Sequence, residues 1–273
     1  MSYGIYKTAL KDGTASFRVS FYHAKKHIAI GSYSDEKAAG AALKEALALY
    51  DDKTITIWNF RHFISEVSSD KAVSILNHRD NHVYFKTPIY LMQGYFLYFL
   101  NDKRIIKFDN DDLFYYSTHR ILIHDGHLYV NDYGSQYSLF ARYGIRNFAV
   151  KGVDYEFANG DANDLRYENV IVINPYNGVR QLDYNGMIRY EAKIHINGYV
   201  RIGIFHSMEK AAVAYNKAVD FCLSHGLYRN FVKNYIVDLS ANEYKSTYDS
   251  ISLPESLETA INAVSQRSPG DAE

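Results

Sequence analysis

The feature of this sequence that most limits its possible folds is an internal repeat. Two stretches, one toward each end of the chain, share residue types in the same order and at similar spacing. The matching residues, with the first copy named first, are Gly31 and Tyr33 with Gly203 and Phe205, Glu36–Ala39 with Glu209–Ala212, Lys44 with Lys217, and Asn59-Phe60 with Asn230-Phe231. This agreement indicates a duplication, so we expect one small structural unit to occur twice.

The first copy has the pattern of three short strands followed by one helix. Its apolar residues Phe17, Val19 and Phe21 alternate with polar ones, which predicts a strand with one buried face. Turn residues on both sides of this strand predict a three-stranded antiparallel sheet over residues 4–33. An alanine-rich helix over residues 36–50 should then pack on one face of the sheet.

The second copy repeats this order over residues 178–234. Asn197-Gly198 is a strong signal for a two-residue hairpin. The third strand is expected at residues 200–205, and a helix is expected over residues 207–225.

The most informative motifs of the second copy are Gly178-Val179-Arg180, Ile202–Phe205, Glu209–Asn216 and Asn230-Phe231. With these motifs both copies resemble the Apetala-type (ethylene-response-factor, integrase-type) DNA-binding domain. The first copy is the poorer match, because Gly4-Ile5-Tyr6 has no arginine at its third position. The resemblance implies a three-stranded sheet on one helix that reads the major groove, so double-stranded DNA is the expected partner.

If the helix covers one face of each sheet, the opposite face is free to bind DNA. The side chains expected there in the second copy are Arg180, Arg189, Glu191, Lys193, His195, Tyr199 and Arg201. Those expected in the first copy are Lys7, Arg18, Ser20, Tyr22, Lys25, Lys26 and His27. Arginine and lysine on a sheet in the major groove can bind guanine edges and phosphates. The alternative is an ordinary solvated strand face.

Between the copies, residues 157–169 read F-A-N-G-D-A-N-D-L-R-Y-E-N. The polar residues of this stretch are spaced as Gly160, Asp161, Asp164, Arg166 and Asn169. The spacing resembles the loop and helix start of phage-type HNH homing endonucleases, in which a histidine activates water beside a divalent metal. The resemblance implies a turn at Gly160 and helix caps at Asp161 and Asp164.

The residues that this chemistry needs are missing from the stretch. Phe157 stands where that pattern has the catalytic histidine, and Leu165 stands where it has a later asparagine. Phenylalanine can neither accept a proton nor bind a metal. The sequence therefore predicts a degenerate, structural HNH-like turn with no catalytic residue, no metal and no cofactor. Two alternatives stay open, and both would require Mg²⁺: an oxygen site made by Asp154, Glu156 and Asp161, or a replacement base from among His119, His124 and His127.

Other patterns in the central segment predict its secondary structure. The expected elements are a helix over residues 63–76, strands over 87–92, 95–100 and 104–108, a short acidic helix start over 109–114, and a hairpin about Asp125-Gly126. His78 and His82 lie four residues apart, a weak metal signal, and are expected to be solvated residues in a turn.

Composition limits the partners and the compartment. The 30 basic and 31 acidic residues give a net charge of −1, which excludes a uniformly basic coat but permits a local basic face. The single cysteine, Cys222, cannot form an internal disulfide, so a cytoplasmic, DNA-associated location is expected. No signal peptide or membrane-spanning run is recognised. Residues 254–266 predict an amphipathic helix that docks on its own chain, with self-association as the alternative.

Together these patterns predict an α+β protein. Its expected parts are a first Apetala-like domain over residues 1–60, a degenerate HNH-like domain over 61–175, a second Apetala-like domain over 176–237, and a tail with an amphipathic helix over 238–273. The predicted function is sequence-specific binding of duplex DNA without catalysis, as a regulator of phage or mobile-element type, an origin that only the resemblance implies. The alternatives are an active metal-dependent endonuclease and a protein-binding adaptor.

Overall fold

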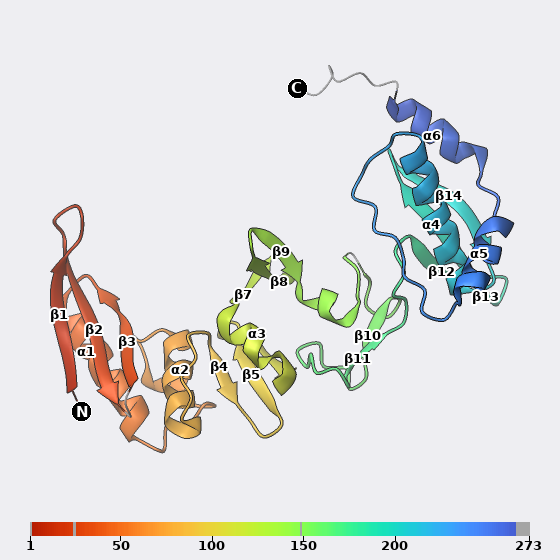
Figure 1. Cartoon of the computed structure of the whole chain (residues 1–273). Coiled ribbons are helices and arrows are strands. Elements are labelled where there is room, and N and C mark those ends of the chain that lie inside the picture. The colour runs from red at the N-terminus through yellow and green to blue at the C-terminus, as the bar shows by residue number, and fades with distance from the viewer. Residues whose placement is uncertain (1, 24–25, 148, 266–273) are drawn as a thin grey trace. The chain divides into compact units, whose positions relative to one another are not determined.

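The structure, a computed structural model, describes residues 2–23, 26–147 and 149–265 and has an α+β fold (Figure 1). Its helices are α1 (Glu36–Asp51), α2 (Ser69–Asn81), α3 (Leu113–Thr118), α4 (Met208–Ser224), α5 (Ala241–Ser250) and α6 (Glu255–Ser265), with short 3-10 turns at η1 (Phe60–Phe63), η2 (Asn110–Asp112) and η3 (Leu139–Tyr143). None of the helices among these described residues is long and apolar enough to cross a membrane.

The strands form small antiparallel sheets. Those of the first copy are β1 (Ser2–Ala9), β2 (Ala15–His23) and β3 (Lys26–Tyr33), and those of the second are β12 (Val179–Tyr184), β13 (Met187–His195) and β14 (Tyr199–Phe205). Between them lie β4 (Ile89–Leu91), β5 (Tyr95–Phe99), β6 (Ile105–Asp109), β7 (Ile121–His124), β8 (His127–Asp132), β9 (Ser135–Ser138), β10 (Tyr155–Phe157) and β11 (Val170–Val172).

Both copies have the predicted order of three strands and one helix. In the first, Ala39 and Ala42 of α1 are fully buried against the sheet together with Phe21, because alanine lets a helix approach a sheet closely. Helix α1 is capped by Asp35, and α4 is capped by Ser207, whose hydroxyl accepts a hydrogen bond from the Lys210 backbone N–H.

The two sheets also share an irregularity that alternation does not predict. The register of β2 with β3 shifts beside Gly31, and that of β13 with β14 shifts beside Gly203. The side chain of Tyr33 covers Gly31, and that of Phe205 covers Gly203. A Cβ added to Gly31 would lie 3.0 Å from the Tyr33 hydroxyl, and a Cβ added to Gly203 would lie 2.9 Å from the Phe205 ring. A β-bulge at the same place in both copies supports the inferred duplication.

In the central segment the three strands expected over residues 87–108 are confirmed as β4, β5 and β6, whereas β9 was not predicted. The helix predicted over residues 63–76 is wrong in its bounds. The carboxylate of Glu45 accepts hydrogen bonds from the backbone N–H groups of Glu66 and Val67, which holds this stretch outside a helix. Helix α2 therefore begins only at Ser69 and runs on to Asn81.

The longer course of α2 changes the position of His78. Its side chain is buried near Tyr50 and Tyr84 instead of being solvated in a turn, so that expectation was wrong for this residue. His82 ends the helix in a left-handed conformation.

The compact units divide the chain differently from the predicted domain boundaries. One unit contains residues 1–139 and 157–170, and the other contains residues 140–156 and 171–273. The predicted boundary at residue 60 falls inside one hydrophobic core, in which Phe60 and Phe99 are buried together with the first sheet. Residues 1–60 do not close their own core, because α2 and β5 complete it.

The C-terminal helices belong to the second unit. Helix α6 buries Leu257 and Ile261 in the core formed by the second sheet and α4, which confirms docking on its own chain. Self-association through α6 stays a prediction. Helix α5 was not expected, since it is polar and buries none of its side chains fully.

Candidate nucleic-acid interface

The residues predicted to bind DNA in the second copy lie on one face of the β12-β13-β14 sheet. Arg180 on β12 stands opposite Glu191 on β13, which stands opposite Ile204 on β14. Lys193 stands opposite Arg201. Because side chains alternate along each strand and the bulge keeps the two rows in phase, these residues point away from α4.

One of these cations has a protein partner. Arg201 Nε lies 2.6 Å from Glu191 Oε1, and the Glu191 side chain is only 10% exposed whereas that of Arg201 is 64% exposed. The carboxylate is thus held beneath the guanidinium. Glu191 lies on the predicted face but beneath Arg201, as its ion-pair partner, and its predicted contact with DNA stays a prediction.

The other cations are free of carboxylates. Within the described part of the chain, Arg180, Arg189 and Lys193 have no carboxylate oxygen within 4.0 Å. The Lys193 ammonium lies 4.4 Å from the ring centre of Tyr199, whose ring centre is 5.0 Å from that of His195. Together with Arg201 and Glu191, these side chains leave the face with a clear excess of positive charge.

A hollow of about 510 Å³ lies at one edge of this face. It forms because β12 begins only at Val179, so the end of β13 has no neighbouring strand on that side. Lys193, His195 and Arg180 line it together with Arg146 and Asn147, which the sequence patterns did not single out.

A buried polar network fixes Arg146 beside the hollow. Its guanidinium donates to Asp154 Oδ1 at 2.6 Å and to the Asn174 carbonyl at 2.9 Å. Asn174 Nδ2 donates to the same Asp154 oxygen, and the Val150 N–H donates to the other. Both oxygens of Asp154 are therefore engaged by protein donors. In the described residues no group of three or more His, Cys, Asp or Glu side chains is placed to hold a metal.

In the first sheet only part of the predicted set lies on the exposed face. Arg18, Ser20 and Tyr22 share the face that points away from α1, as does His27, whose Nε2 lies 3.0 Å from the Ser20 hydroxyl. This face also carries the exposed Tyr6, opposite Arg18, which the patterns missed.

Two of the predicted lysines lie on the other face. Lys7 pairs with Phe17, and its ammonium lies 5.9 Å from that ring. Lys26 pairs with His23, and its ammonium lies 5.4 Å from the ring centre of Tyr84. Their predicted placement on the face of Arg18 was wrong, because the register of each strand sets them one residue out of phase with Arg18. Lys25 lies outside the described residues.

A hollow of about 640 Å³ lies over this first exposed face. Arg18, His27 and Tyr6 line it, and Lys71 of α2 reaches its border. The Lys71 ammonium donates to the Tyr84 hydroxyl at 2.8 Å. With one arginine on its strands, the first face is much less cationic than the second.

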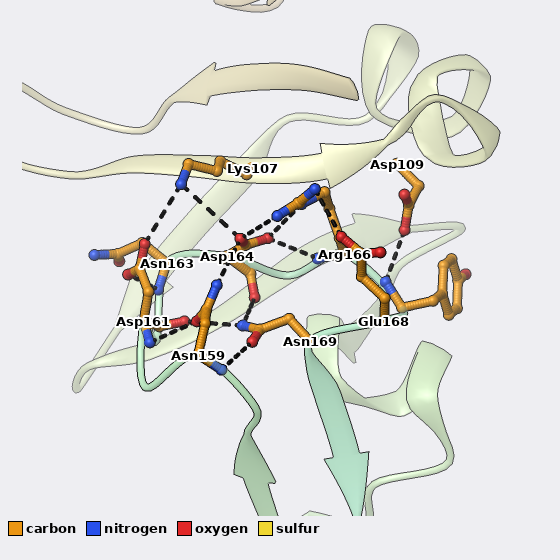
Figure 2. A network of polar contacts seen from close by, with 10 residues as sticks. Lys107, Asp109, Asn159, Asp161, Asn163, Asp164, Arg166, Glu168 and Asn169 are labelled. Atoms are coloured by element: carbon orange, nitrogen blue, oxygen red, sulfur yellow. Dashed lines mark hydrogen bonds and ion pairs between the residues drawn. The ribbon is translucent and has the colours of Figure 1, made fainter. Parts of the chain in front are cut away.

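The HNH-like turn is a docked loop between β10 and β11 (Figure 2). Gly160 makes the turn with a φ of 77°. The loop pairs with the open edge of β6, since the Lys107 N–H donates to the Asn163 carbonyl and the Leu165 N–H donates to the Lys107 carbonyl. No helix begins in residues 158–169, so the predicted capping roles of Asp161 and Asp164 were wrong.

The side chains of the loop bind one another and β6 instead. Asp164 is fully buried and accepts hydrogen bonds from Arg166 at 2.7 and 2.8 Å and from Asn159 at 3.1 Å (Figure 2). Burial raises the pKa of the Asp164 carboxyl, but the hydrogen bonds from Arg166 and its charge outweigh this and leave that pKa below its usual value. Asn169 Nδ2 donates to the carbonyls of Asp161 and Asp164.

The positions that lack the nuclease residues are filled by apolar packing. Phe157 and Leu165 are both buried. Asp161 is bound by Lys107, Asn159 and Asn163, and its carbonyl is bound by Asn169; no histidine is among these contacts in the described residues. The polar atoms of the loop are thus used to hold it on β6.

No family model matches the chain, and neither a curated protein nor an experimentally determined structure is similar enough to it to count as a match.

Proposed function

We propose that this protein binds duplex DNA through the exposed face of the second sheet and does not cleave it. The observation that carries the proposal is the group formed by Arg180, Arg189 and Lys193. These three cations lie on one face of the sheet with no carboxylate within reach among the described residues. Such a face is stabilised by an anionic partner, and the major groove of B-DNA is wide enough for a β-ribbon.

The side chains of this face are suited to recognise base edges as well as to attract phosphates. An arginine can donate two hydrogen bonds to O6 and N7 of guanine, while lysines and further arginines bind phosphates. Glu191 holds Arg201 in one orientation, and a guanidinium fixed in this way loses less conformational entropy when it binds a base edge.

The first sheet would add a second, weaker contact. Arg18, Tyr6 and His27 give it one permanent cation and two groups that can donate hydrogen bonds. Two modules on one chain increase the overall affinity when both can reach the same duplex. We infer a role as an intracellular regulator that occupies its DNA site.

The absence of cleavage is supported by the residues at the HNH-like turn. Phe157 cannot act as a base, and the carboxylate of Asp164 is occupied by Arg166 and Asn159. The polar groups of this loop are bound to each other, so the loop has a structural role. It offers no free side chain that could take a proton from an attacking water.

The test is selection of bound duplexes from a random pool, with Mg²⁺ present and cleavage scored in the same tubes. The triple change Arg180→Ala, Arg189→Ala, Lys193→Ala should lower affinity about 100-fold at 0.1 M salt. It should also flatten the salt dependence, with the slope falling by about one for each phosphate that the variant no longer binds. The matched control is Lys245→Ala on α5, which packs on α4, away from the sheet.

Each outcome has a definite meaning. Enrichment of a sequence by the native protein, weak binding by the triple variant and full binding by the control support the proposal. Equal binding by all three proteins would overturn the assignment of this face. Nicking of a bound duplex would favour the endonuclease alternative, and retention of no DNA at moderate salt would favour the adaptor.

A further inference from the structure

The second sheet has another hollow, of about 580 Å³, at the end opposite the one that Arg146 lines. Three of the side chains that line it, Arg189, His206 and Lys210, are cationic or can become so, and three others, Tyr184, Ser250 and Ser252, carry hydroxyls. No aspartate or glutamate is among the residues that line it in the described part of the chain. This combination of cations and neutral donors is suited to an oxyanion.

The hollow is larger than a phosphate group needs. The hollow is open to solvent, so a phosphate on a chain can reach its cations. Arg189 connects it to the proposed DNA interface, because this residue also lies on the exposed face of the sheet, where it pairs with Leu182. Its guanidinium is bound only to the Ile188 carbonyl and the Met187 sulfur among the described residues, and so stays free to bind an anion.

One wall of the hollow comes from outside the repeated unit. It is made by Ser250, the last residue of α5, and by Ile251 and Ser252 of the connector that leads to α6. Lys217 of α4 fixes this connector: its Nζ donates to the Tyr248 carbonyl at 2.7 Å and to the Ile251 carbonyl at 2.8 Å.

Apolar burial fixes the connector further. Ile251 is buried in the core of the second unit, as is Leu257 of α6. The two serines are therefore held at the hollow on a tethered stretch of chain. Lys217 is a positioning residue for this wall and does not itself line the hollow.

We propose that this hollow seats a backbone phosphate of the duplex bound by the second sheet, with Arg189, Lys210 and His206 as its cations and the α5–α6 connector as its wall. The inference rests on the proposed DNA binding and extends it, because it makes the link between α5 and α6 part of the interface. Lys210 is in the first turn of α4, where the helix dipole also favours an anion.

The experiment compares four variants with the native chain and with Lys245→Ala. The double change His206→Ala, Lys210→Ala should lower duplex affinity about 10-fold and reduce the salt slope by about one, since this variant binds one phosphate fewer. The change Ser250→Ala, Ser252→Ala should weaken binding less. Lys217→Met should release the wall and weaken binding, and Lys217→Arg, which can still donate to both carbonyls, should restore it.

A titration with inorganic phosphate, followed by backbone amide shifts, separates this inference from the proposed function. Saturable shifts at positions 210 and 252 of the native chain that disappear in the double variant support the phosphate site. A reduced salt slope of DNA binding by the double variant supports it too. A native protein that binds duplex DNA with the same affinity and slope as the double variant would overturn the phosphate site and leave the sheet interface standing. Phosphate binding by a chain that retains no duplex would identify a site for a free anion and overturn the proposed binding of DNA.

Discussion

Arg201 and Glu191 form an ion pair across β13 and β14, with Nε 2.6 Å from Oε1. The pair is asymmetric, because the carboxylate side chain is 10% exposed and the guanidinium side chain is 64% exposed. The negative charge therefore lies under the surface, and the positive charge faces the solvent in a set direction. On a face that is proposed to bind DNA, this ion pair would lower the attraction for phosphates and improve the orientation of the arginine.

Replacing Glu191 with glutamine should separate these two effects. Glu191→Gln removes one negative charge from the face, so affinity for random duplex DNA should rise about 10-fold, with a steeper salt dependence. Discrimination between the selected and random sequences should fall, because Arg201 is held less firmly. Competition binding at two salt concentrations measures both quantities. A variant with higher affinity and unchanged discrimination would show that Glu191 does not orient Arg201.

Asp164 should contribute stability only while it is ionised. Its folded-state pKa lies below the unfolded value, so its contribution is complete above about pH 4 and is lost as the pH falls through the folded pKa. Asp164→Asn should lower the free energy of unfolding by about 2 kcal/mol at pH 7, and the difference should shrink at pH 3. Urea unfolding followed by the emission of Trp58, the one tryptophan of the chain, measures this.

Asp161 is the matched control for that experiment. Its side chain is 42% exposed and its closest cation, Lys107 Nζ, is 3.7 Å away. Asp161→Asn should cost less than about 0.5 kcal/mol, as is usual for exposed ion pairs. Equal losses at both positions would mean that the buried bonds to Arg166 do not set the stability of the loop.

The burial of His78 should make the first unit sensitive to mild acid. Burial lowers the pKa of this imidazole, and the neighbouring His23, His82 and Lys26 lower it further. A depressed histidine pKa means that stability is complete above the unfolded value of about 6.5 and is lost as the pH falls through the folded pKa.

Substitution at His78 tests this directly. His78→Gln should flatten the dependence of unfolding on pH between about 7 and 5, measured by urea titration at each pH. The exposed His62 serves as control, and His62→Gln should keep the slope of the native chain. A slope that persists in His78→Gln would assign the acid sensitivity to another group.

Gly178 is the position at which the second unit should tolerate a side chain least. Its φ is +71°, and a Cβ there would lie 2.1 Å from the ring of Tyr215 and 2.6 Å from the Lys193 carbonyl. Gly178→Ala should therefore destabilise the second unit by about 3 kcal/mol. Gly186 has a similar φ of +77° with nothing within 4 Å, so Gly186→Ala should cost only about 1 kcal/mol.

Thiol labelling of Cys222 follows this unit alone. The side chain is fully buried, and burial raises the pKa of its thiol, so it reacts only when the unit opens. Labelling of Gly178→Ala should be much faster than that of Gly186→Ala. Similar rates in the two variants would show that the chain relieves the clash by a small shift.

What the sequence predicted well rests on short-range patterns. The alternation about Val19 and the alanine-rich helices each depend on neighbours a few residues apart, and the structure has both. The hairpin at Asn197-Gly198 is also present, but the prediction of a two-residue loop was wrong: His195 pairs with Tyr199, so Ile196 belongs to the loop as well. The faces of Lys7 and Lys26 were wrong because a shift of one residue in strand register moves a side chain to the opposite face. Local pattern does not fix that register.

The errors at the proposed sites come from contacts distant in sequence. Arg146 is held by the Asn174 carbonyl, 28 residues away, and no local signal links the two. The caps expected at Asp161 and Asp164 failed because an aspartate that closes a turn on a backbone N–H two residues ahead has the same sequence signature as a helix cap. Helix α5 was missed because only Tyr244 and Tyr248 of this polar segment pack on the core.

The seating of residues 163–165 along β6 has a further consequence for the whole chain. A free strand edge pairs readily with the strands of other molecules. Here that edge is covered by residues that follow it only after the chain has left the first unit at residue 139 and returned at residue 157. A fragment ending at residue 139 would carry the entire first sheet and still aggregate, since its β6 would be without the loop that covers its edge.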